Sequence, residues 1–241
     1  MSLEFLSPSF GAIARSPMER QALAAGAELE RRDGWNVAVR FDGEEAERAR
    51  CQTSVGFADL SHLGKIEVQA GPGELAAIAA EPLELGRATR FNGGWWCPFT
   101  PERAIALCEP AALAGLRERL EAAAARYDTL TSVIDVSTAF AALVLQGPLA
   151  REVFARFTAL DLRDVATPPE AFRPGSVART PGAVLRESED RWLMLFGAAL
   201  GQYVWTVVAD AAEHLGGGPV GVDVLETVGA AVRAEEAQPS A

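Results

Sequence analysis

Cysteine is scarce in this sequence, with three residues among 241. Cys51, Cys97 and Cys108 lack the spacing of metal ligands, and three thiols cannot all pair with one another. Disulfides persist mainly in oxidising compartments, so we interpret these residues as reduced thiols of a cytoplasmic protein. There is no run of about 18 uncharged apolar residues and no secretory signal pattern at the N-terminus, so we expect no membrane-spanning helix.

Basic and metal-binding residues are also few. The formal net charge is −11 and the sequence pI is near 4.8, whereas nucleic-acid-binding proteins present a basic surface. We therefore expect no nucleic-acid partner, although a local basic patch would still suit an anionic ligand. His62 and His214 are the only histidines, and neither a metal site nor a Ser-His-Asp triad finds support in them.

A repeat is the most informative feature that the sequence does contain. Residues 59–72 (DLSHLGKIEVQAGP) and 135–148 (DVSTAFAALVLQGP) carry Asp-x-Ser and Gly-Pro at the same spacing. In each copy a strand pattern leads into a Gly-Pro turn and a helix, as expected for proline at a first helical position. Asp59 and Asp135 are candidate catalytic carboxylates, but their duplication favours turns in which they accept backbone N–H groups. The repeat predicts a duplicated structural unit.

The remaining pattern mixes strands and helices without strict βαβ alternation. It predicts an α+β fold of antiparallel sheets with packed helices. We place a flexible lead-in at 1–16, a first lobe at 17–127, a second lobe at 128–230 and a disordered tail at 231–241. Residues 199–218 predict a long helix stopped by glycines, and residues 219–228 a final strand or turn.

Residues 90–99 (RFNGGWWCPF) form the least ordinary stretch. Paired glycines before Trp95 and Trp96 are compatible with an aromatic wall for a flat heterocycle, with a core or with a partner interface. The residues alone leave these three interpretations open. Residues 216–221 (GGGPVG) match a dinucleotide-binding spacing, but they follow a helix and contain Pro219, so this interpretation fails.

Residues 55–72 (VGFADLSHLGKIEVQAGP) resemble the signature of the glycine-cleavage T-protein (aminomethyltransferase) family, which carries a similar D-x-S-H-x-G-K segment. Residues 133–153, 160–162, 171–180 and 201–211 look more like the gamma subunit of heterotetrameric sarcosine oxidase, which is itself similar to the folate-binding part of the T-protein. The resemblance covers roughly residues 16–228. It implies two pseudo-symmetric lobes of antiparallel sheet, without the C-terminal barrel of the T-protein.

The same resemblance implies a folate pocket formed by Asn92, Trp95, Trp96 and Glu189. The T-protein pattern Gly-Gly-x-x-Asp-Asp contains an acid that helps to activate folate, but here Cys97 and Pro98 stand at the acidic positions. Neither accepts a proton as a carboxylate does. The folate-contacting glycine-tyrosine-threonine-glycine-glutamate stretch falls near residues 184–190, where Glu189 is the match, and Gly229 holds the place of a family arginine.

These departures favour a subunit without catalytic residues of its own. We expect a sarcosine-oxidase-gamma-like chain that docks on flavoprotein subunits of a hetero-oligomer. The complex would demethylate sarcosine or a related N-methyl amine oxidatively and transfer the one-carbon unit to tetrahydrofolate. Flavin is expected on a partner subunit only, and tetrahydrofolate stays open as a ligand of this chain. The alternative is a stand-alone folate-binding protein or a divergent aminomethyltransferase, and a third hypothesis is a scaffold with neither role.

Overall fold

Residues 12–228 are described by the structure, a computed structural model. The strands are β1 (Ala14–Arg15), β2 (Glu28–Arg32), β3 (Trp35–Arg40), β4 (Gly56–Asp59), β5 (Gly64–Gln69), β6 (Thr89–Phe91), β7 (Gly94–Thr100), β8 (Arg103–Cys108), β9 (Ser132–Asp135), β10 (Phe140–Gln146), β11 (Phe172–Val177), β12 (Thr180–Ser188), β13 (Arg191–Gly197) and β14 (Gly218–Pro219). The helices are α1 (Glu19–Ala24), α2 (Glu44–Thr53), α3 (Glu74–Ala79), α4 (Leu113–Ala124), α5 (Ala150–Ala155) and α6 (Gly201–Glu213), and residues 222–228 are also helical.

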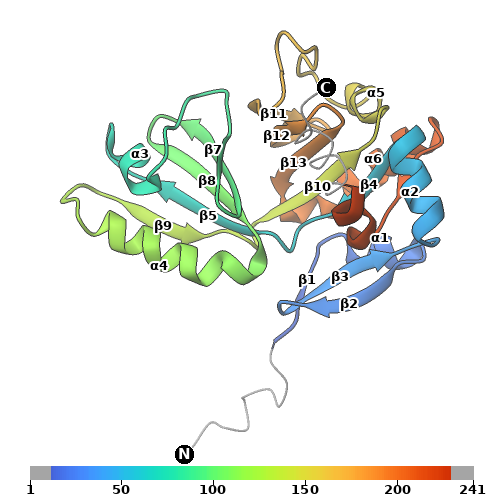
Figure 1. Cartoon of the computed structure of the whole chain (residues 1–241), viewed down its shortest axis with the longest axis horizontal. Coiled ribbons are helices and arrows are strands. Elements are labelled where there is room, and N and C mark those ends of the chain that lie inside the picture. Colours follow the sequence, from blue (N-terminus) through green and yellow to red (C-terminus); the bar gives the residue numbers. More distant parts are fainter. Residues whose placement is uncertain (1–11, 229–241) are drawn as a thin grey trace, which may run out of the picture.

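Two large sheets share one plan, and Figure 1 shows them as neighbouring lobes. The first has the order β6-β7-β8-β5-β9, and the second has the order β11-β12-β13-β10-β4-β14. The five strands of the first sheet, in that order, correspond to the first five strands of the second sheet. In both sheets all neighbouring strands among these five are antiparallel. The expected α+β fold with two pseudo-symmetric lobes is confirmed. A small sheet, β1-β3-β2, completes the described strands.

The two halves exchange a strand. β4 pairs with β10 in the second sheet, and β9 pairs with β5 in the first sheet. Each of the expected lobes, 17–127 and 128–230, therefore contributes one strand to the sheet of the other. The chain leaves β4 and β9 through the two Asp-x-Ser motifs, which thus mark the two crossings between the sheets.

The aspartates of these motifs form matching turns. Asp59 Oδ1 accepts the Ser61 backbone N–H at 2.9 Å, and Asp135 Oδ1 accepts the Ser137 backbone N–H at 2.9 Å. Both carboxylates thus satisfy the backbone N–H two residues further on, the local bond that aspartate typically makes in turns. The architectural interpretation of the repeat is confirmed.

The serines of the motifs connect one half to the other. Ser61 Oγ accepts the backbone N–H of Ala142 at 3.2 Å, and Ser137 Oγ accepts the backbone N–H of Lys65 at 2.9 Å. Both bonds span more than seventy positions of the sequence and are buried. A buried backbone N–H needs a partner, so each serine supports the strand that enters the opposite sheet.

Lys65, the only lysine of the chain, lies fully buried at the crossing. Its Nζ donates to the carbonyl oxygens of Leu63 at 2.8 Å and Ser61 at 3.0 Å. Burial lowers the pKa of the Lys65 ammonium to about 8, and the nearby Asp59 carboxylate opposes that shift. A charge buried in this way is tolerated because carbonyl oxygens replace its water shell.

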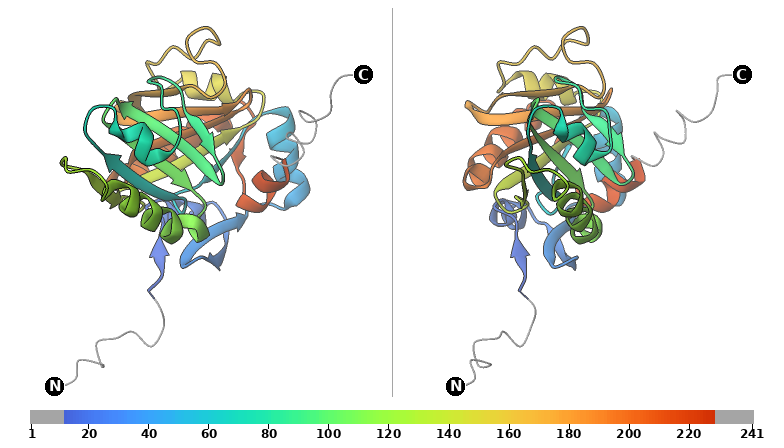
Figure 2. Two further views of the ribbon diagram at one scale, coloured as in Figure 1. Left: turned by 60° about the vertical axis from the view of Figure 1, so that its left-hand side comes forward. Right: turned by 90° about the vertical axis from the view of Figure 1, so that its left-hand side faces the viewer.

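Three hydrophobic clusters define the layers. One lies between the second sheet and α1, α5 and α6, and another lies between the first sheet and α3 and α4. The third cluster fills the space between the two large sheets, where Trp95 and Leu107 pack in one core with Leu185 and Leu193. Figure 2 shows the first sheet in front of the second when the molecule is viewed from the side of the first lobe. No helix within residues 12–228 is long and apolar enough to cross a membrane.

Some expected elements differ from those observed. Residues 219–228 were expected as a strand or turn, yet residues 222–228 form a helix, in which Val224 and Leu225 pack into the inter-sheet cluster. The long helix expected over 199–218 ends at Glu213. Of the expected lead-in only residues 12–16 are described, and they include β1, while the expected tail at 231–241 lies outside the described residues.

We predict that Ser61→Ala and Ser137→Ala each lower the free energy of unfolding. Each variant leaves a buried backbone N–H without its acceptor, which costs about 1–3 kcal/mol. Urea unfolding measures the effect. Thr53→Ala is the control, because its exposed hydroxyl bonds only to a carbonyl of its own helix, and a surface change of this kind stays within about 0.5 kcal/mol. Equal stability of all three variants would contradict this account of the crossings.

Candidate functional site

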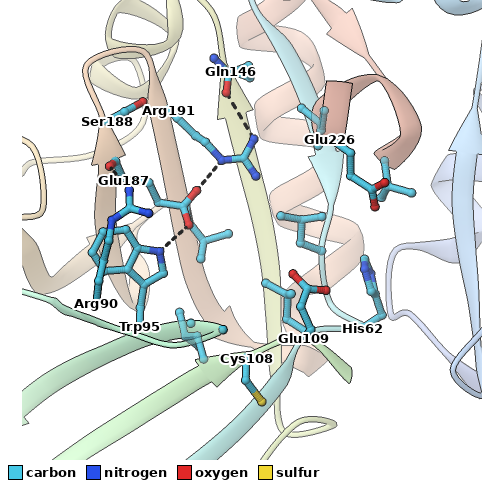
Figure 3. A pocket seen from close by; sticks show the side chains of 18 of the residues that line it. His62, Arg90, Trp95, Cys108, Glu109, Gln146, Glu187, Ser188, Arg191 and Glu226 are labelled. Carbon is cyan, nitrogen blue, oxygen red and sulfur yellow. Dashed lines mark hydrogen bonds and ion pairs between the residues drawn. The ribbon is translucent and has the colours of Figure 1, made fainter. Parts of the chain in front are cut away.

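A cavity of about 420 Å³ lies between the two large sheets. Figure 3 shows the side chains that line it, which come from both lobes and from the helical segment 222–228. Its lining combines apolar side chains with a few polar and charged ones, the usual composition of a small-molecule site. The polar and charged side chains are His62, Arg90, Glu109, Gln146, Glu187, Ser188, Arg191 and Glu226.

Trp95 forms one wall of this cavity. Side chains of a strand alternate between its faces, so Trp95 faces the second lobe while Trp96 is buried in the cluster under α3 and α4. The wall depends on Gly94, because a Cβ there would lie 1.8 Å from the carbonyl oxygen of Leu107. The guanidinium of Arg90 covers the Trp95 ring at 4.1 Å from its centroid, a cation–π contact.

Glu187 faces Trp95 from the second lobe. The pairing of β12 with β13 shifts register between Arg186 and Ser188, so Glu187 is the extra residue of a bulge. Bulges re-aim a side chain next to functional sites. Here Glu187 Oε1 accepts the indole N–H of Trp95 at 3.1 Å, a bond that joins the two lobes.

Arg191 extends this bond into a chain across the cavity wall. The Nε of Arg191 donates to Glu187 Oε2 at 2.5 Å, and its Nη1 donates to Gln146 Oε1 at 3.3 Å. A carboxylate offers about four acceptor positions. Glu187 uses two of them within the protein, which leaves acceptor capacity for a ligand that carries N–H groups.

The opposite side of the cavity carries two carboxylates and a histidine. Figure 3 shows Glu109, Glu226 and His62 there, away from the Trp95 wall. Burial raises the pKa of Glu109, and the neighbouring Glu226 carboxylate adds to that shift. Burial lowers the pKa of His62 to about 4, and the Lys65 ammonium contributes in the same direction. His62 is therefore neutral at physiological pH.

Of the four pocket residues predicted from the sequence, one lines the cavity and the other three lie elsewhere. Trp95 lines the cavity, and Trp96 is buried on the other face of its strand. Asn92 is exposed in the turn between β6 and β7, and Glu189 is exposed in the turn between β12 and β13. Whether any of them contacts folate stays a prediction.

Sequence reasoning missed Glu187, Arg191 and Gln146. A signal for Glu187 was present, because Ala183, Leu185 and Glu187 alternate along one face of a strand, and the first two of them pack in the inter-sheet cluster. Arg191 and Gln146 had no such signal, since their proximity comes from the pairing of β10 with β13.

The described part of the chain contains no metal-binding cluster, and its cysteine thiols are buried. Residues 12–228 contain no group of three or more His, Cys, Asp and Glu side chains that could hold a metal ion. All three cysteines are free and buried. Burial raises the pKa of Cys97 well above its ordinary value, so its thiol stays protonated and a poor nucleophile.

Sequence comparison relates the chain to aminomethyltransferases, although no family model matches it. The aminomethyltransferase of Saccharopolyspora erythraea is 26% identical over 236 residues, which cover 89% of this chain and 62% of that protein. The probable aminomethyltransferase of Natronomonas pharaonis is 28% identical, over 76% of this chain and 56% of that protein. The chain thus spans less than two thirds of the length of these curated relatives.

Comparison with solved structures shows that this chain shares its fold with a T-protein and with a chain of sarcosine oxidase. Aminomethyltransferase T of the glycine cleavage system from Bartonella henselae superposes with a TM-score of 0.70 at 17% identity, over 88% of this chain and 61% of that chain. A chain of heterotetrameric sarcosine oxidase from Corynebacterium sp. U-96 superposes with a TM-score of 0.65 at 22% identity, over 84% of this chain and 96% of that chain.

The two lobes with their exchanged strands define a protein of the T-protein fold class. The sequence is similar to that of aminomethyltransferases, and the fold is shared with a T-protein and with a chain of heterotetrameric sarcosine oxidase, as expected for a T-protein-like chain.

We predict that His62 makes the fold less stable in acid. Its pKa is lowered in the folded state, so between about pH 6.5 and pH 4 the unfolded chain binds a proton that the folded chain does not. The free energy of unfolding therefore falls as the pH falls through this window. Urea unfolding of the wild type and of His62→Gln at about pH 7 and about pH 4.5 measures the difference. The variant should lose less stability on acidification, and an equal loss would show that His62 does not contribute.

Proposed function

We propose that this chain is a T-protein-like subunit that binds reduced folate in the inter-lobe cavity and acts within a sarcosine-oxidase-like complex. Partner subunits would bind the flavin and oxidise sarcosine or a related N-methyl amine. The bond from Trp95 across the lobes to Glu187 is the observation on which the folate site depends, because it fixes a carboxylate beside an aromatic wall.

The extent of the structural match supports the subunit role. The superposition covers 96% of the matched chain of heterotetrameric sarcosine oxidase, whereas it covers 61% of the T-protein chain. The described fold thus matches nearly all of a chain of that hetero-oligomer, and this likeness supports assembly with other subunits.

The residues at the cavity fit a flat heterocycle with an amino-substituted edge. The volume of the cavity lies in the range of small-molecule sites, roughly 300–1,000 Å³. Glu187 has acceptor positions left for the N–H groups of such an edge. Because Arg90 already covers the Trp95 ring, a ligand ring would stack on the planar guanidinium or lie against Leu193 and Val222, which also line the cavity.

The same residues give little support to aminomethyl transfer by this chain. At the position of the T-protein acid, Cys97 is fully buried and its neighbour is Pro98. A missing general acid or base typically removes about 10²–10⁴-fold of rate. If Cys97 and Pro98 transfer no proton, the chain can still bind folate as the acceptor of a one-carbon unit, which fits the proposed subunit.

Titration of the purified chain with tetrahydrofolate, followed by tryptophan fluorescence, tests this proposal. We predict saturable quenching with a dissociation constant in the micromolar range, about −8 kcal/mol at 1 µM. Glu187→Gln should weaken binding about tenfold, because one charge-assisted acceptor is replaced by a neutral one. Trp95→Phe should remove most of the quenching, since the ring that reports binding is lost.

Glu189→Gln provides the matched control. It makes the same chemical change two positions away, in an exposed turn that does not line the cavity. Its affinity should equal that of the wild type. No saturable quenching up to about 1 mM tetrahydrofolate would overturn the folate site, and weakening by Glu189→Gln but not by Glu187→Gln would move the site to the β12–β13 turn.

A further inference from the structure

A second cavity, of about 390 Å³, lies on the second lobe. It is lined by residues 156–159 after α5, by Ser176 of β11, by Ala178 and Arg179 of the β11–β12 turn, and by Tyr203 and Val207 of α6. We call it the α5–α6 groove. It shares no lining residue with the inter-lobe cavity, so its role is independent of the proposed function.

The groove concentrates positive charge in an acidic protein. Arg156 and Arg179 line it, and no acidic residue does, although the chain contains 33 aspartates and glutamates. Neither guanidinium has a hydrogen bond or an ion pair with any residue of the described range 12–228. Nearby Arg151 and Arg163 are paired with carboxylates. Arg156 and Arg179 are thus left available to an external anion.

The backbone around these arginines is fixed. The Ala178 N–H donates to the Phe157 carbonyl at 3.0 Å, and the Thr158 hydroxyl donates to the Ser176 carbonyl at 2.7 Å. The Tyr203 hydroxyl donates to the Ala178 carbonyl at 3.1 Å. These bonds join both sides of the groove and anchor it to α6, so little ordering is needed on binding.

The turn that carries Arg179 has an unfavourable backbone conformation. Ala178 and Arg179 have φ values of 48° and 62°, a left-handed region that glycine or asparagine usually occupies in two-residue hairpins. Such residues persist where the surroundings hold them, and they cluster at ligand-binding positions. A glycine at position 179 would suit the turn better but would remove the guanidinium.

Apolar surface lies beside the two charges. Tyr203, a large side chain in the first turn of α6, is 46% exposed. Phe157 and Val207 are half-buried at the same groove and also pack on the core beneath it. A ligand that reaches both arginines would therefore also contact an aromatic and aliphatic floor.

We propose that the α5–α6 groove binds a small organic anion, with its phosphate or carboxylate group between Arg156 and Arg179 and its apolar body on Phe157 and Tyr203. Guanidinium groups bind both kinds of anion through charge-assisted hydrogen bonds. The volume of the groove suits a small molecule.

Calorimetric titration of the full chain with phenyl phosphate and, separately, with benzoate tests the site. We predict saturable binding of at least one probe, tighter than that of inorganic phosphate, and weaker at higher salt because the contact is electrostatic. Arg156→Gln with Arg179→Gln should weaken binding at least about tenfold. The probe that binds more tightly identifies the anionic group.

Two single variants separate binding from folding. Arg179→Gly should leave thermal stability equal or higher, because glycine tolerates the positive φ, and should still weaken binding. Arg126→Gln changes an exposed arginine outside the groove and should bind as the wild type does. Absence of saturable binding of both probes up to about 10 mM, or equal affinity of the wild type and the double arginine variant, would overturn the proposal.

Discussion

The exchange of β4 and β9 between the two sheets holds the two lobes together and positions the cavity between them. Because each lobe contains a strand of the other, the sheets cannot separate without breaking pairs of backbone hydrogen bonds. The crossings are made by short segments whose polar groups are buried, so each needs an internal partner. The aspartates and serines of the two motifs, together with the Lys65 ammonium, provide these partners.

The inter-lobe cavity is a consequence of that exchange. Both sheets are held face to face, and the side chains between them form one hydrophobic cluster. Trp95, Glu187 and Arg191 line one side of the space between the sheets and are joined by hydrogen bonds. The other side carries a neutral histidine and two carboxylates, so the two sides of the site differ in charge.

The position that the resemblance matches to the T-protein acid differs in its surroundings from the carboxylate that lines the cavity. Cys97 is buried in the inter-sheet core and cannot exchange protons readily. Glu187 instead offers a fixed acceptor at the cavity wall. The proposed binding subunit would need the second property without the first. The α5–α6 groove lies on another surface, and its two arginines have no ion pair within residues 12–228, which is why we propose it as a separate binding site.

The repeat, the α+β class and the architectural role of Asp59 and Asp135 could all be predicted from the sequence. These follow from local patterns, because hydrophobic periodicity and turn chemistry act over a few residues. The resemblance of the motifs also led to the superfamily. Trp95 was found because paired aromatic residues after glycines are conspicuous, but the strand alternation that separates it from Trp96 needed the strand to be located first.

Which sheet each strand joins, and which polar groups meet, became known from the three-dimensional structure. Glu187 contacts Trp95 across 92 positions of the sequence, and Arg191 contacts Gln146 across 45. Glu187 stands at a bulge and lines the cavity, while Glu189, two positions away, lies exposed in the next turn. The final helix at 222–228 likewise depends on the inter-sheet core that its apolar residues cover. Strand alternation can place Glu187 on the inter-sheet face, but the partner it meets there depends on pairing and burial between distant segments, which local sequence pattern does not reveal.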